Sequence, residues 1–408
     1  MGDNKINRRG FLRRAGGIAA GAIGFPYIIP SSALGKAGTV SPSNRIVMGC
    51  IGVGSMGTGD MKAFLNKDEV QVVAVCDVDS NNRNRAKDLV NQKYGNSDCA
   101  GYNDFREIIN RNDIDAVMIA TPDQWHAIPA IMAARAGKDV HAQKPLAYTI
   151  AEGRAIVDAV QKYGIVWQTG SQQRSDRIFR FACELVRNGR IGKVHTVKVG
   201  LPNKSTIRDK GTDPSPVPEG FDYDMWLGPA PWQPYCPSRC HWNFRWISDY
   251  SGGQITDWAG HHIDIAHWGM DTELSAPVEI EGSGIWPKGP LFDTVEDYIF
   301  TCKYAEGFTM IVSGKFPLGI MFEGDKGWIF VTRGKMDAEP KSLLTSEIGP
   351  NEIHLYECND HKQNFIDCVK SRSKTIAPVD VAHHSIMAGH LGVAAIKLGR
   401  KLKWDVKN

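Results

Sequence analysis

A short polar stretch in the second half of the chain has the residue types needed for proton transfer. Asp257, His261 and Asp264 are spaced four and three residues apart within the sequence GGQITDWAGHHID. On a regular helix these spacings place side chains on one face, so the three groups are expected to point the same way. A histidine beside a carboxylate is a common general acid/base, whereas a solvated polar face is the alternative explanation. His262 and His267 fall on other faces and are expected to be structural.

A glycine-rich loop near residue 50 indicates a nucleotide site. Gly52, Gly54 and Gly57 form the pattern G-x-G-x-x-G, with Ser55 and Met56 between the last two glycines. The first glycine permits a tight turn, the second lets the backbone approach a pyrophosphate, and the third lets a helix pack closely on a strand. An apolar run precedes the loop and a helical period follows it, which is the context that the motif needs.

Asp77 lies twenty residues past the third glycine, at the end of the apolar run VQVVAVCDVD. A carboxylate at this place accepts hydrogen bonds from the ribose hydroxyls and repels a 2′-phosphate, so it favours NAD over NADP. Arg83 and Arg85 follow closely, and they leave NADP possible. The alternative is a Rossmann-like domain whose glycine turn binds nothing.

Strand and helix signals alternate from Asn44 to about Gly170. The apolar runs are RIVMGCIG, VQVVAVCDVD, DAVMIAT, DVHAQ and IVWQT. Stretches with helical periodicity separate them, among them residues 80–94 and 150–163. Strands that alternate with helices predict a parallel sheet covered on both faces. We therefore expect a Rossmann dinucleotide-binding domain over residues 44–170.

The pattern changes after about residue 170. One more helix is expected to end near Asn188, and strand-like runs then follow at 192–201, 295–304, 308–314 and 327–332. Turns that contain glycine separate these runs, which is typical of an antiparallel sheet. Two further helices are expected near 360–370 and 381–401. We expect residues 171–408 to form a substrate-binding and catalytic domain of the α+β type.

The first 43 residues have the features of an export signal followed by a linker. The sequence NRRGFLRR contains twin arginines, Arg8 and Arg9, before a weakly apolar Gly/Ala-rich run at 15–30. This resembles a twin-arginine (Tat) signal peptide, which carries folded proteins across the inner membrane. We expect cleavage between residues 33 and 43 and a periplasmic or other extracytoplasmic location. A disordered basic tail is the alternative.

Composition argues against two classes of partner. The formal charge is only +3 over 408 residues, and no concentrated basic face is evident, so nucleic acid is not expected. Hydrophobic residues make up 42% and charged residues 23%, which is an ordinary globular balance. No later stretch is long and apolar enough to anchor the mature protein in a membrane.

The cysteines do not indicate disulfides or a metal site. There are nine, an odd number, and a protein exported after folding in a reducing compartment should not need disulfides. Cys50 and Cys76 lie within apolar runs, where a thiol acts as a small hydrophobic group. Cys236, Cys240 and His241 cluster, but their spacing matches no common structural zinc pattern, so no metal is expected.

Four more motifs follow the glycine loop in a fixed order. They are TPDQWH at 121–126, QKPL at 143–146, IGKV at 191–194 and GGQITDWAGHHID at 252–264. Together they resemble the Gfo/Idh/MocA family of sugar and inositol oxidoreductases over essentially all of residues 44–401. The resemblance implies a Rossmann domain followed by an α/β domain with an open, mostly antiparallel sheet, and an active site in the cleft between them. It also implies a carbohydrate substrate and a homo-oligomer.

The same resemblance assigns catalytic roles. Lys144 occupies the lysine of the family's E-K-P motif, so it is expected beside both the reacting oxygen and the cofactor; Gln143 departs from the usual glutamate. Asp257 and His261 match the family's D-x-x-x-H stretch, as the substrate-binding aspartate and the general acid/base. Whether Lys144 or His261 takes the proton stays open at this point.

Further contacts are expected on both sides of the cleft. Thr121, Pro122 and His126 match the family's cofactor-side loop, and Arg174 matches an arginine that lines the cleft. Six of the eleven tryptophans fall between residues 226 and 268. Aromatic faces suit the C–H faces of a pyranose, although core packing explains the same cluster equally well. Trp242 and Arg245 are the expected substrate contacts.

Three functions are compatible with these features. The first is a sugar oxidoreductase that acts on a CH–OH group, with a tightly held, internally recycled cofactor, because free NAD is expected to be scarce outside the cytoplasm. The second is a glycosidase or epimerase that uses NAD internally through a transient keto-sugar. The third is a non-catalytic sugar-binding protein, because Gln143 departs from the catalytic motif.

Overall fold

The computed structural model describes residues 44–405. The predicted export signal, its linker and its cleavage region, residues 1–43, lie outside the described residues.

A six-stranded parallel sheet occupies the N-terminal part of the described chain, in the order β3-β2-β1-β4-β5-β6. Its strands are β1 (Ile46–Ile51), β2 (Val70–Cys76), β3 (Ala100–Tyr102), β4 (Ala116–Ile119), β5 (Asp139–Ala142) and β6 (Trp167–Thr169). Every residue of β4 and β5 is buried, as expected for a parallel sheet covered on both faces. The predicted Rossmann sheet is confirmed.

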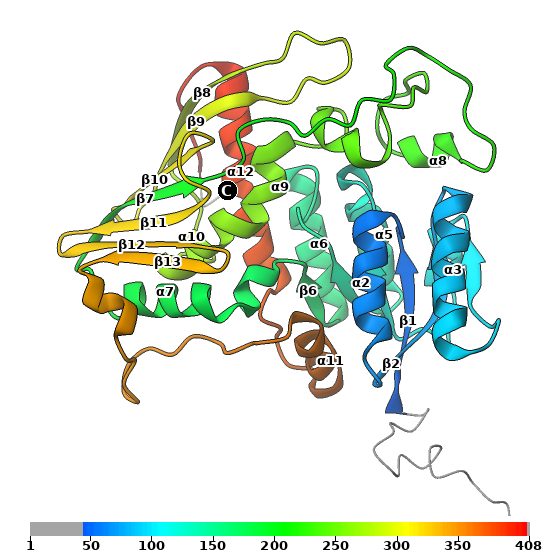
Figure 1. Cartoon of the computed structure of the whole chain (residues 1–408), viewed down its shortest axis with the longest axis horizontal. Helices are drawn as coiled ribbons and strands as arrows, with labels where there is room; N and C mark the ends of the chain where they lie inside the picture. The colour runs from blue at the N-terminus through cyan, green and yellow to red at the C-terminus, as the bar shows by residue number, and fades with distance from the viewer. Residues whose placement is uncertain (1–43, 406–408) are drawn as a thin grey trace, which may run out of the picture. The chain divides into compact units, whose positions relative to one another are not determined.

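Local signals fix the helices that connect these strands. They are α2 (Ser55–Leu65), α3 (Ser80–Tyr94), α4 (Phe105–Ile109), α5 (Ala127–Arg135) and α6 (Ile150–Tyr163). In α6, Thr149 and Glu152 form a reciprocal capping box, and Gly164 ends the helix at a φ of +63°. Because such caps are written in the sequence, the bounds predicted for α3 and α6 agree with the structure. Figure 1 shows α2 and α3 beside β1 and β2.

An eight-stranded sheet follows, in the order β13-β12-β11-β7-β10-β9-β8-β14. Its strands are β7 (Val194–Gly200), β8 (Glu279–Ile285), β9 (Glu296–Lys303), β10 (Thr309–Ser313), β11 (Gly319–Gly324), β12 (Gly327–Thr332), β13 (Lys335–Glu339) and β14 (Leu402–Lys403). Only β7 and β10 pair in parallel, so the sheet is mostly antiparallel, as expected. Strands β8, β11 and β13 were not predicted, because glycines or charged residues interrupt their apolar pattern, and the short strands β3 and β14 were not predicted either.

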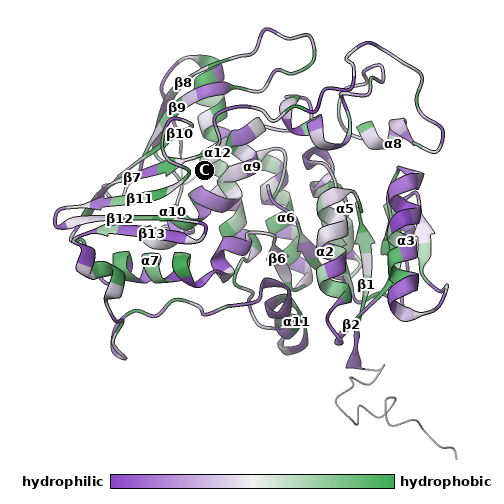
Figure 2. Cartoon of the chain, viewed as in Figure 1, coloured by the Kyte–Doolittle hydropathy of each residue, from purple (hydrophilic) through white to green (hydrophobic). Residues whose placement is uncertain are grey.

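The remaining helices are α7 (Arg177–Arg187), α8 (Tyr223–Leu227), α9 (Gly253–Trp258), α10 (Asp264–Met270), α11 (His361–Ser371) and α12 (Val379–Leu398). Helix α12 packs against α6 of the first part and against β8 and α9 of the second, so it joins the two halves of the described chain. Figure 2 shows hydrophobic residues concentrated in the strands, whereas α3 is mostly hydrophilic.

All nine cysteines are buried free thiols, and Cys50 and Cys76 lie in β1 and β2 as predicted. Among residues 44–405 there is no group of three or more His, Cys, Asp or Glu side chains placed to hold a metal ion. Within the same range, no helix combines the length and apolar character that crossing a bilayer requires.

Candidate active site

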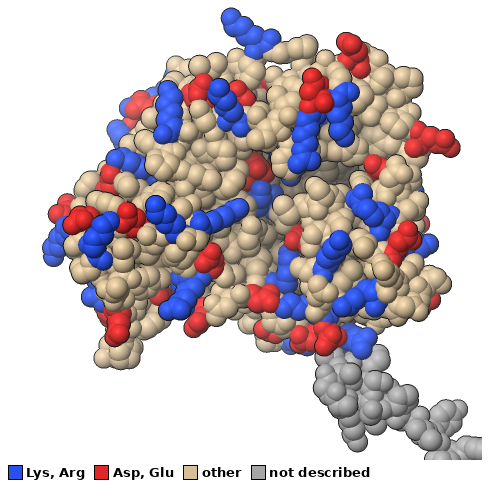
Figure 3. Space-filling view, viewed as in Figure 1, with Lys and Arg blue, Asp and Glu red and all other residues tan. Residues whose placement is uncertain are grey.

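A cavity of about 800 Å³ lies where the carboxyl ends of the parallel strands meet the segment 202–253. On one side it is lined by residues that follow β1, β2, β4 and β5. The predicted residues among its lining are Gly52, Gly54, Ser55, Met56, Gly57, Asp77, Thr121, Pro122, His126, Lys144, Trp242 and Arg245. In Figure 3 a recess crosses the middle of the visible face, with charged side chains at its edges.

The glycine loop has the geometry of a pyrophosphate cradle. Gly52 has a φ of +78°, and a Cβ on Gly57 would lie 1.8 Å from the Gly52 carbonyl oxygen. Both positions therefore require glycine. A Cβ on Gly54 would meet only the Asn82 side chain, at 4.0 Å, so open space lies in front of this backbone. No side chain caps α2 at Gly54, which leaves its N-terminal N–H groups available to a phosphate. These residues fit a dinucleotide.

Asp77 is held at the ribose end of this loop. Its Oδ2 accepts a hydrogen bond from the Val53 N–H and its Oδ1 accepts one from the Asp79 N–H, both at 2.9 Å. Burial raises the pKa of Asp77 to about 6, against the lowering effect of these backbone donors. Arg83 turns back to the Asp77 carbonyl oxygen, whereas Arg85 lines the cavity.

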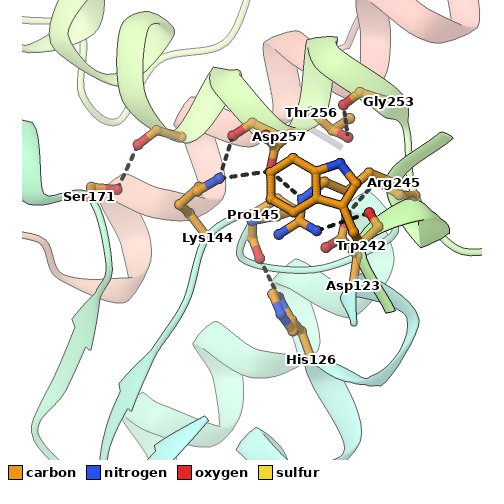
Figure 4. A network of polar contacts seen from close by, with 12 residues as sticks. Asp123, His126, Lys144, Pro145, Ser171, Trp242, Arg245, Gly253, Thr256 and Asp257 are labelled. Atoms are coloured by element: carbon orange, nitrogen blue, oxygen red, sulfur yellow. Dashed lines mark hydrogen bonds and ion pairs between the residues drawn. The ribbon is translucent and has the colours of Figure 1, made fainter. Parts of the chain in front are cut away.

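The loop after β4 is tied to the loop after β5. His126 is buried, with Nδ1 2.5 Å from the Pro145 carbonyl oxygen and Nε2 2.9 Å from that of Thr121 (Figure 4). The Thr121 hydroxyl is buried without a partner among the described residues, and Pro122 lines the cavity beside it. His126 therefore holds the backbone of the next residue after Lys144, rather than serving only as a helix cap.

Lys144 lines the cavity and forms an ion pair with Asp257, which is not itself among the lining residues. The Lys144 Nζ donates to the Asp257 Oδ1 at 2.7 Å and to the Asp257 carbonyl oxygen at 2.9 Å (Figure 4). Arg245 Nε lies 3.6 Å from the same Oδ1. Burial works against ionisation of Asp257, but the two cations outweigh it and hold its pKa below the usual value. A Cβ on Gly260 would lie 3.0 Å from the Lys144 Cβ, so glycine lets the two chains approach here.

His261 lies close enough to Lys144 for their charges to interact. It is 5% exposed, it is not among the residues that line the cavity, and its Nδ1 has no partner among the described residues. Burial, followed by the charges of Lys144 and Arg333, holds its pKa well below 6.5. The imidazole is therefore neutral near pH 7 and able to accept a proton. His262 and His267 turn away as predicted, toward the Gly200 carbonyl oxygen and the Tyr304 hydroxyl.

The predicted positions of Asp264 and Arg174 were wrong. A π-helical turn at Ala259–Ile263 interrupts the helix, and its extra residue rotates Asp264 away from the face that carries Asp257. Asp264 instead accepts two hydrogen bonds from Arg174: Nε donates to Oδ2 at 2.6 Å and Nη2 donates to Oδ1 at 3.0 Å. Arg174 also pairs with Glu273 at 2.6 Å, is 2% exposed and does not line the cavity. Its role is structural.

The six tryptophans between 226 and 268 lie in different surroundings, and Trp232 is largely exposed, while Trp258 is half-buried. Trp226, Trp246 and Trp268 are buried, although Trp226 also borders the cavity. Trp242 lines the cavity, and its Nε1 donates to the Thr206 carbonyl oxygen at 2.7 Å. Arg245 lies over the same indole, with Cζ 4.8 Å from the ring centre (Figure 4).

The structure adds a carboxylate that the sequence did not indicate. The Gln143 amide donates to the Asp60 Oδ2 at 2.6 Å, and Lys362 Nζ lies 2.8 Å from the Asp60 Oδ1. The negative charge absent at position 143 is thus supplied nearby by α2. No sequence spacing relates these residues, because α2 and α11 meet only through the fold.

Hydrogen bonds attach segment 202–253 to the Rossmann part. Ser80 N–H donates to the Gly220 carbonyl oxygen and Asp222 N–H donates to that of Val78, both at 2.9 Å. The Asn103 amide donates to the Asp222 Oδ2 at 2.7 Å. Further along, the Trp125 indole N–H donates to the Met225 and Trp226 carbonyl oxygens. This segment therefore roofs the cavity beside the ribose end.

Family models match both parts of the chain. Residues 46–171 match a model described as an oxidoreductase family with an NAD-binding Rossmann fold. Residues 189–408 match the C-terminal alpha/beta domain model of the same oxidoreductase family.

Individual proteins are similar over different lengths. The alpha-N-acetylgalactosaminidase of Shewanella oneidensis is 34% identical over 173 residues, which are 39% of this chain and only 38% of that relative. The uncharacterized oxidoreductase YrbE of Bacillus subtilis is 24% identical over 332 residues, 79% of this chain and 84% of that relative. The crystal structure of aldose-aldose oxidoreductase from Caulobacter crescentus complexed with glycerol superposes with a TM-score of 0.65 at 20% identity, covering 88% of this chain and 100% of that one. This last likeness concerns the fold alone.

Proposed function

The chain belongs to the Gfo/Idh/MocA oxidoreductase family, and on that premise we propose that it is an NAD-dependent oxidoreductase acting on a CH–OH group of a sugar or sugar derivative. One observation carries the proposal: Lys144 lines a cavity that contains a pyrophosphate cradle, and it also pairs with Asp257 and acts electrostatically on the neutral, buried His261.

The side chains divide the chemistry among them. A bound nicotinamide dinucleotide supplies the acceptor for the hydride that leaves the substrate carbon. The Lys144 ammonium donates a hydrogen bond to the reacting oxygen and stabilises its developing negative charge. His261 accepts the hydroxyl proton, because its pKa lies well below 6.5 and its ring is already neutral. Asp257 fixes the direction of the Lys144 Nζ.

Asp77 favours NAD at the other end of the cavity, because its carboxylate repels a 2′-phosphate. Arg85, which lines the cavity, leaves NADP a possible second cofactor. Titration of the apoprotein with NAD and NADP tests this choice; tighter binding of NADP would contradict it.

We propose further that the cofactor is retained between turnovers, so that each oxidation is followed by a reduction in the same site. Two features support this: segment 202–253 roofs the cavity, and the N-terminal sequence resembles a signal for export of folded proteins. Mass spectrometry of the ligand released when the purified protein is denatured should identify one dinucleotide per chain. Added sugars should change its redox state; sugar binding without any redox change would instead favour a non-catalytic sugar-binding protein.

The location of the protein is a separate proposal. Arg8 and Arg9 should direct the folded, cofactor-loaded protein through the Tat pathway to the periplasm. Replacing both arginines by lysine should leave the protein in the cytoplasm in a fractionation experiment. Export that persists in this variant would contradict the proposal.

A glycosidase or epimerase that works through a transient keto-sugar is the second candidate. It is favoured by the 34% identity to a protein named alpha-N-acetylgalactosaminidase, over a shared region that is only 38% of that relative. A ketone acidifies the adjacent C–H, which permits loss of a neighbouring leaving group before the ketone is reduced again. The two candidates differ in product: the second gives cleaved or inverted sugar, no net NADH, and incorporation of solvent deuterium beside the transient ketone.

A further inference from the structure

The cavity holds more positive than negative charge at its substrate end. Lys144 and Arg245 lie 2.7 and 3.6 Å from the Asp257 carboxylate, and Asp123, a second carboxylate that lines the cavity, acts electrostatically with Arg245. A third cation, Arg208, also lines the cavity. No carboxylate lies within 4 Å of Arg208 anywhere in the described part of the chain. Arg208 is exposed, so water solvates its charge unless an anion binds it.

Arg208 is exposed, but neighbouring groups hold its side chain and its backbone in place. Its guanidinium lies over the Trp242 indole, with Cζ 4.0 Å from the ring centre. Its backbone is held in both directions by the buried Asn243 amide, which accepts from the Arg208 N–H at 2.8 Å and donates to the Arg208 carbonyl oxygen at 2.7 Å. Since Trp242 also bonds to the Thr206 carbonyl oxygen, the strand of backbone that carries Arg208 is tied to the aromatic wall.

Arg208 belongs to the substrate end of the cavity. Consecutive contacts run from Lys144 to Asp257, to Arg245, to the Trp242 ring and finally to Arg208 (Figure 4 shows the first four). This chain of contacts begins at the group that binds the reacting oxygen.

The phosphates of a dinucleotide have a different expected position, at the N-terminus of α2. Lys210, the next cation along the segment, acts electrostatically on His241, whose Nε2 is 3.8 Å from the Asp79 Oδ2 near the ribose end. We therefore assign Lys210 to the ribose end of the cavity and Arg208 to the substrate end.

We propose that the substrate is an anionic carbohydrate whose acidic group binds the Arg208 guanidinium while its ring rests near Trp242 and its reacting hydroxyl meets Lys144. This inference rests on the proposed oxidoreductase function and specifies its substrate class. A planar guanidinium presents two parallel N–H donors to a carboxylate, sulfate or phosphate group. Stacking on an indole leaves its edge free for such a contact.

The test compares matched sugars on the full-length, cofactor-loaded protein. The probes are D-glucose and D-glucuronate, with D-galactose and D-galacturonate as a second pair; D-glucose 6-phosphate and D-glucose 6-sulfate distinguish the kind of acid. Binding is followed by tryptophan fluorescence and calorimetry, and reaction by the absorbance of reduced nicotinamide. We expect at least one acidic sugar to bind roughly tenfold or more tightly than its neutral partner, with an affinity that falls as salt rises.

The variants separate charge from packing. Arg208→Ala should lose roughly tenfold or more in affinity for the acidic sugar and leave the neutral sugar nearly unchanged. Arg208→Lys should retain part of the preference for acidic over neutral sugars, because it keeps the positive charge but loses the two parallel N–H donors of the guanidinium. Lys204→Ala is the control, since Lys204 is an exposed cation of the same segment that does not line the cavity.

Three results would overturn the proposal: equal binding of neutral and acidic sugars, an equal loss for both in Arg208→Ala, or weakened dinucleotide binding in Arg208→Ala without sugar. If neutral sugars react and acidic sugars do not, the substrate class fails and the oxidoreductase function stands. If acidic sugars bind preferentially but never change the redox state of the cofactor, the oxidoreductase function fails and the anion site stands.

Discussion

At the residue scale, Asp257 carries one negative charge between two cations. Lys144 lies 2.7 Å and Arg245 3.6 Å from the same Oδ1. Because both cations act on one oxygen, the ionised form is favoured despite burial, and the pKa of Asp257 is lowered. His261 responds in the opposite direction: burial and the Lys144 charge both disfavour its cation. One lysine thus supports a charged aspartate and a neutral histidine.

The electrostatic effect of Lys144 on His261 predicts where kcat/KM falls at acidic pH and how this limb moves in variants. As pH falls through the pKa of His261, the imidazole is protonated and can no longer accept the substrate proton, so kcat/KM should fall well below pH 6.5. His261→Ala should lower kcat/KM by about 10²- to 10⁴-fold and remove this acidic limb. Lys144→Ala should lower the rate and move the limb to higher pH, since a positive charge is removed. An unmoved limb, measured beside the Lys204→Ala control, would assign the proton to another group.

Asp77 predicts a change in cofactor preference near pH 6. Above a pKa of about 6 its carboxylate is charged and repels a 2′-phosphate; below that pH it is neutral. The ratio of NADP to NAD affinity should therefore rise as pH falls through about 6. Asp77→Asn, which keeps the shape without the charge, should give a ratio that is high and independent of pH. Calorimetric titrations with both dinucleotides measure it, and a flat ratio in the unmodified protein would contradict the assignment.

At the element scale, helices with local stop signals were predicted better than strands at the sheet edges. Helix α6 has a capping box and a C-terminal Gly164 in the left-handed region, and both are visible in the sequence. Strand β13, KMDAE, has no apolar run, because it pairs on one side only and lies at the edge of its sheet. The sequence at Ala259–Ile263 shows no pattern of polar and apolar residues that distinguishes this π-helical turn from a regular helix.

Helices α2 and α11 are joined by a buried ion pair, and this predicts a large stability loss on its disruption. Lys362→Met leaves Asp60 buried without its cation, which should lower the free energy of unfolding by about 3–5 kcal/mol. Adding Asp60→Asn should recover part of this loss. Lys370→Met is the matched control, because its pair with Glu69 is far more exposed and should matter by at most about 1 kcal/mol. Urea denaturation measures all three; equal losses for Lys362 and Lys370 would refute the prediction.

At the scale of the whole molecule, segment 202–253 covers a site that the parallel sheet builds. Its attachment at Ser80, Val78 and Asn103 lies beside the ribose end of the cavity. On the proposed function a dinucleotide binds in the cavity that this segment helps to line, so we expect its attachment to affect the rate of cofactor release. The same segment carries Trp242 and Arg208, so on the proposed function one segment would serve both cofactor retention and substrate recognition.

Weakening the roof should accelerate cofactor loss. Asp222 accepts hydrogen bonds from the Asn103 amide and the Met225 N–H, at 2.7 and 3.0 Å. Asp222→Ala loses both, and NAD release should become roughly tenfold faster. Asp224→Ala, an exposed acidic residue on the same short helix, should release NAD at the original rate. Stopped-flow exchange against a fluorescent analogue measures these rates. Equal release rates for Asp222→Ala and the unmodified protein would show that segment 202–253 does not control cofactor retention.

The proposed homo-oligomer has a candidate surface on the eight-stranded sheet. Ile285 is 61% exposed at the end of β8, and Ile299 is 43% exposed on the neighbouring β9. Large exposed apolar side chains on a sheet often mark an interface. Sedimentation should show a species larger than one chain, and Ile299→Lys should shift it toward the monomer. A monomeric unmodified protein would exclude this assembly.

The sequence alone determined the nucleotide cradle, the parallel sheet and the lysine, aspartate and histidine of the candidate site, because each depends on a local pattern or on a motif in fixed order. It also indicated a mostly antiparallel second sheet. Only the tertiary structure decided that Asp264 and Arg174 lie in the core, that Asp60 supplies a carboxylate beside Gln143, and that Arg208 faces the cavity. These placements depend on contacts between segments distant in the chain and on one extra residue in a helical turn. Neither produces a recognisable spacing of residues in the sequence.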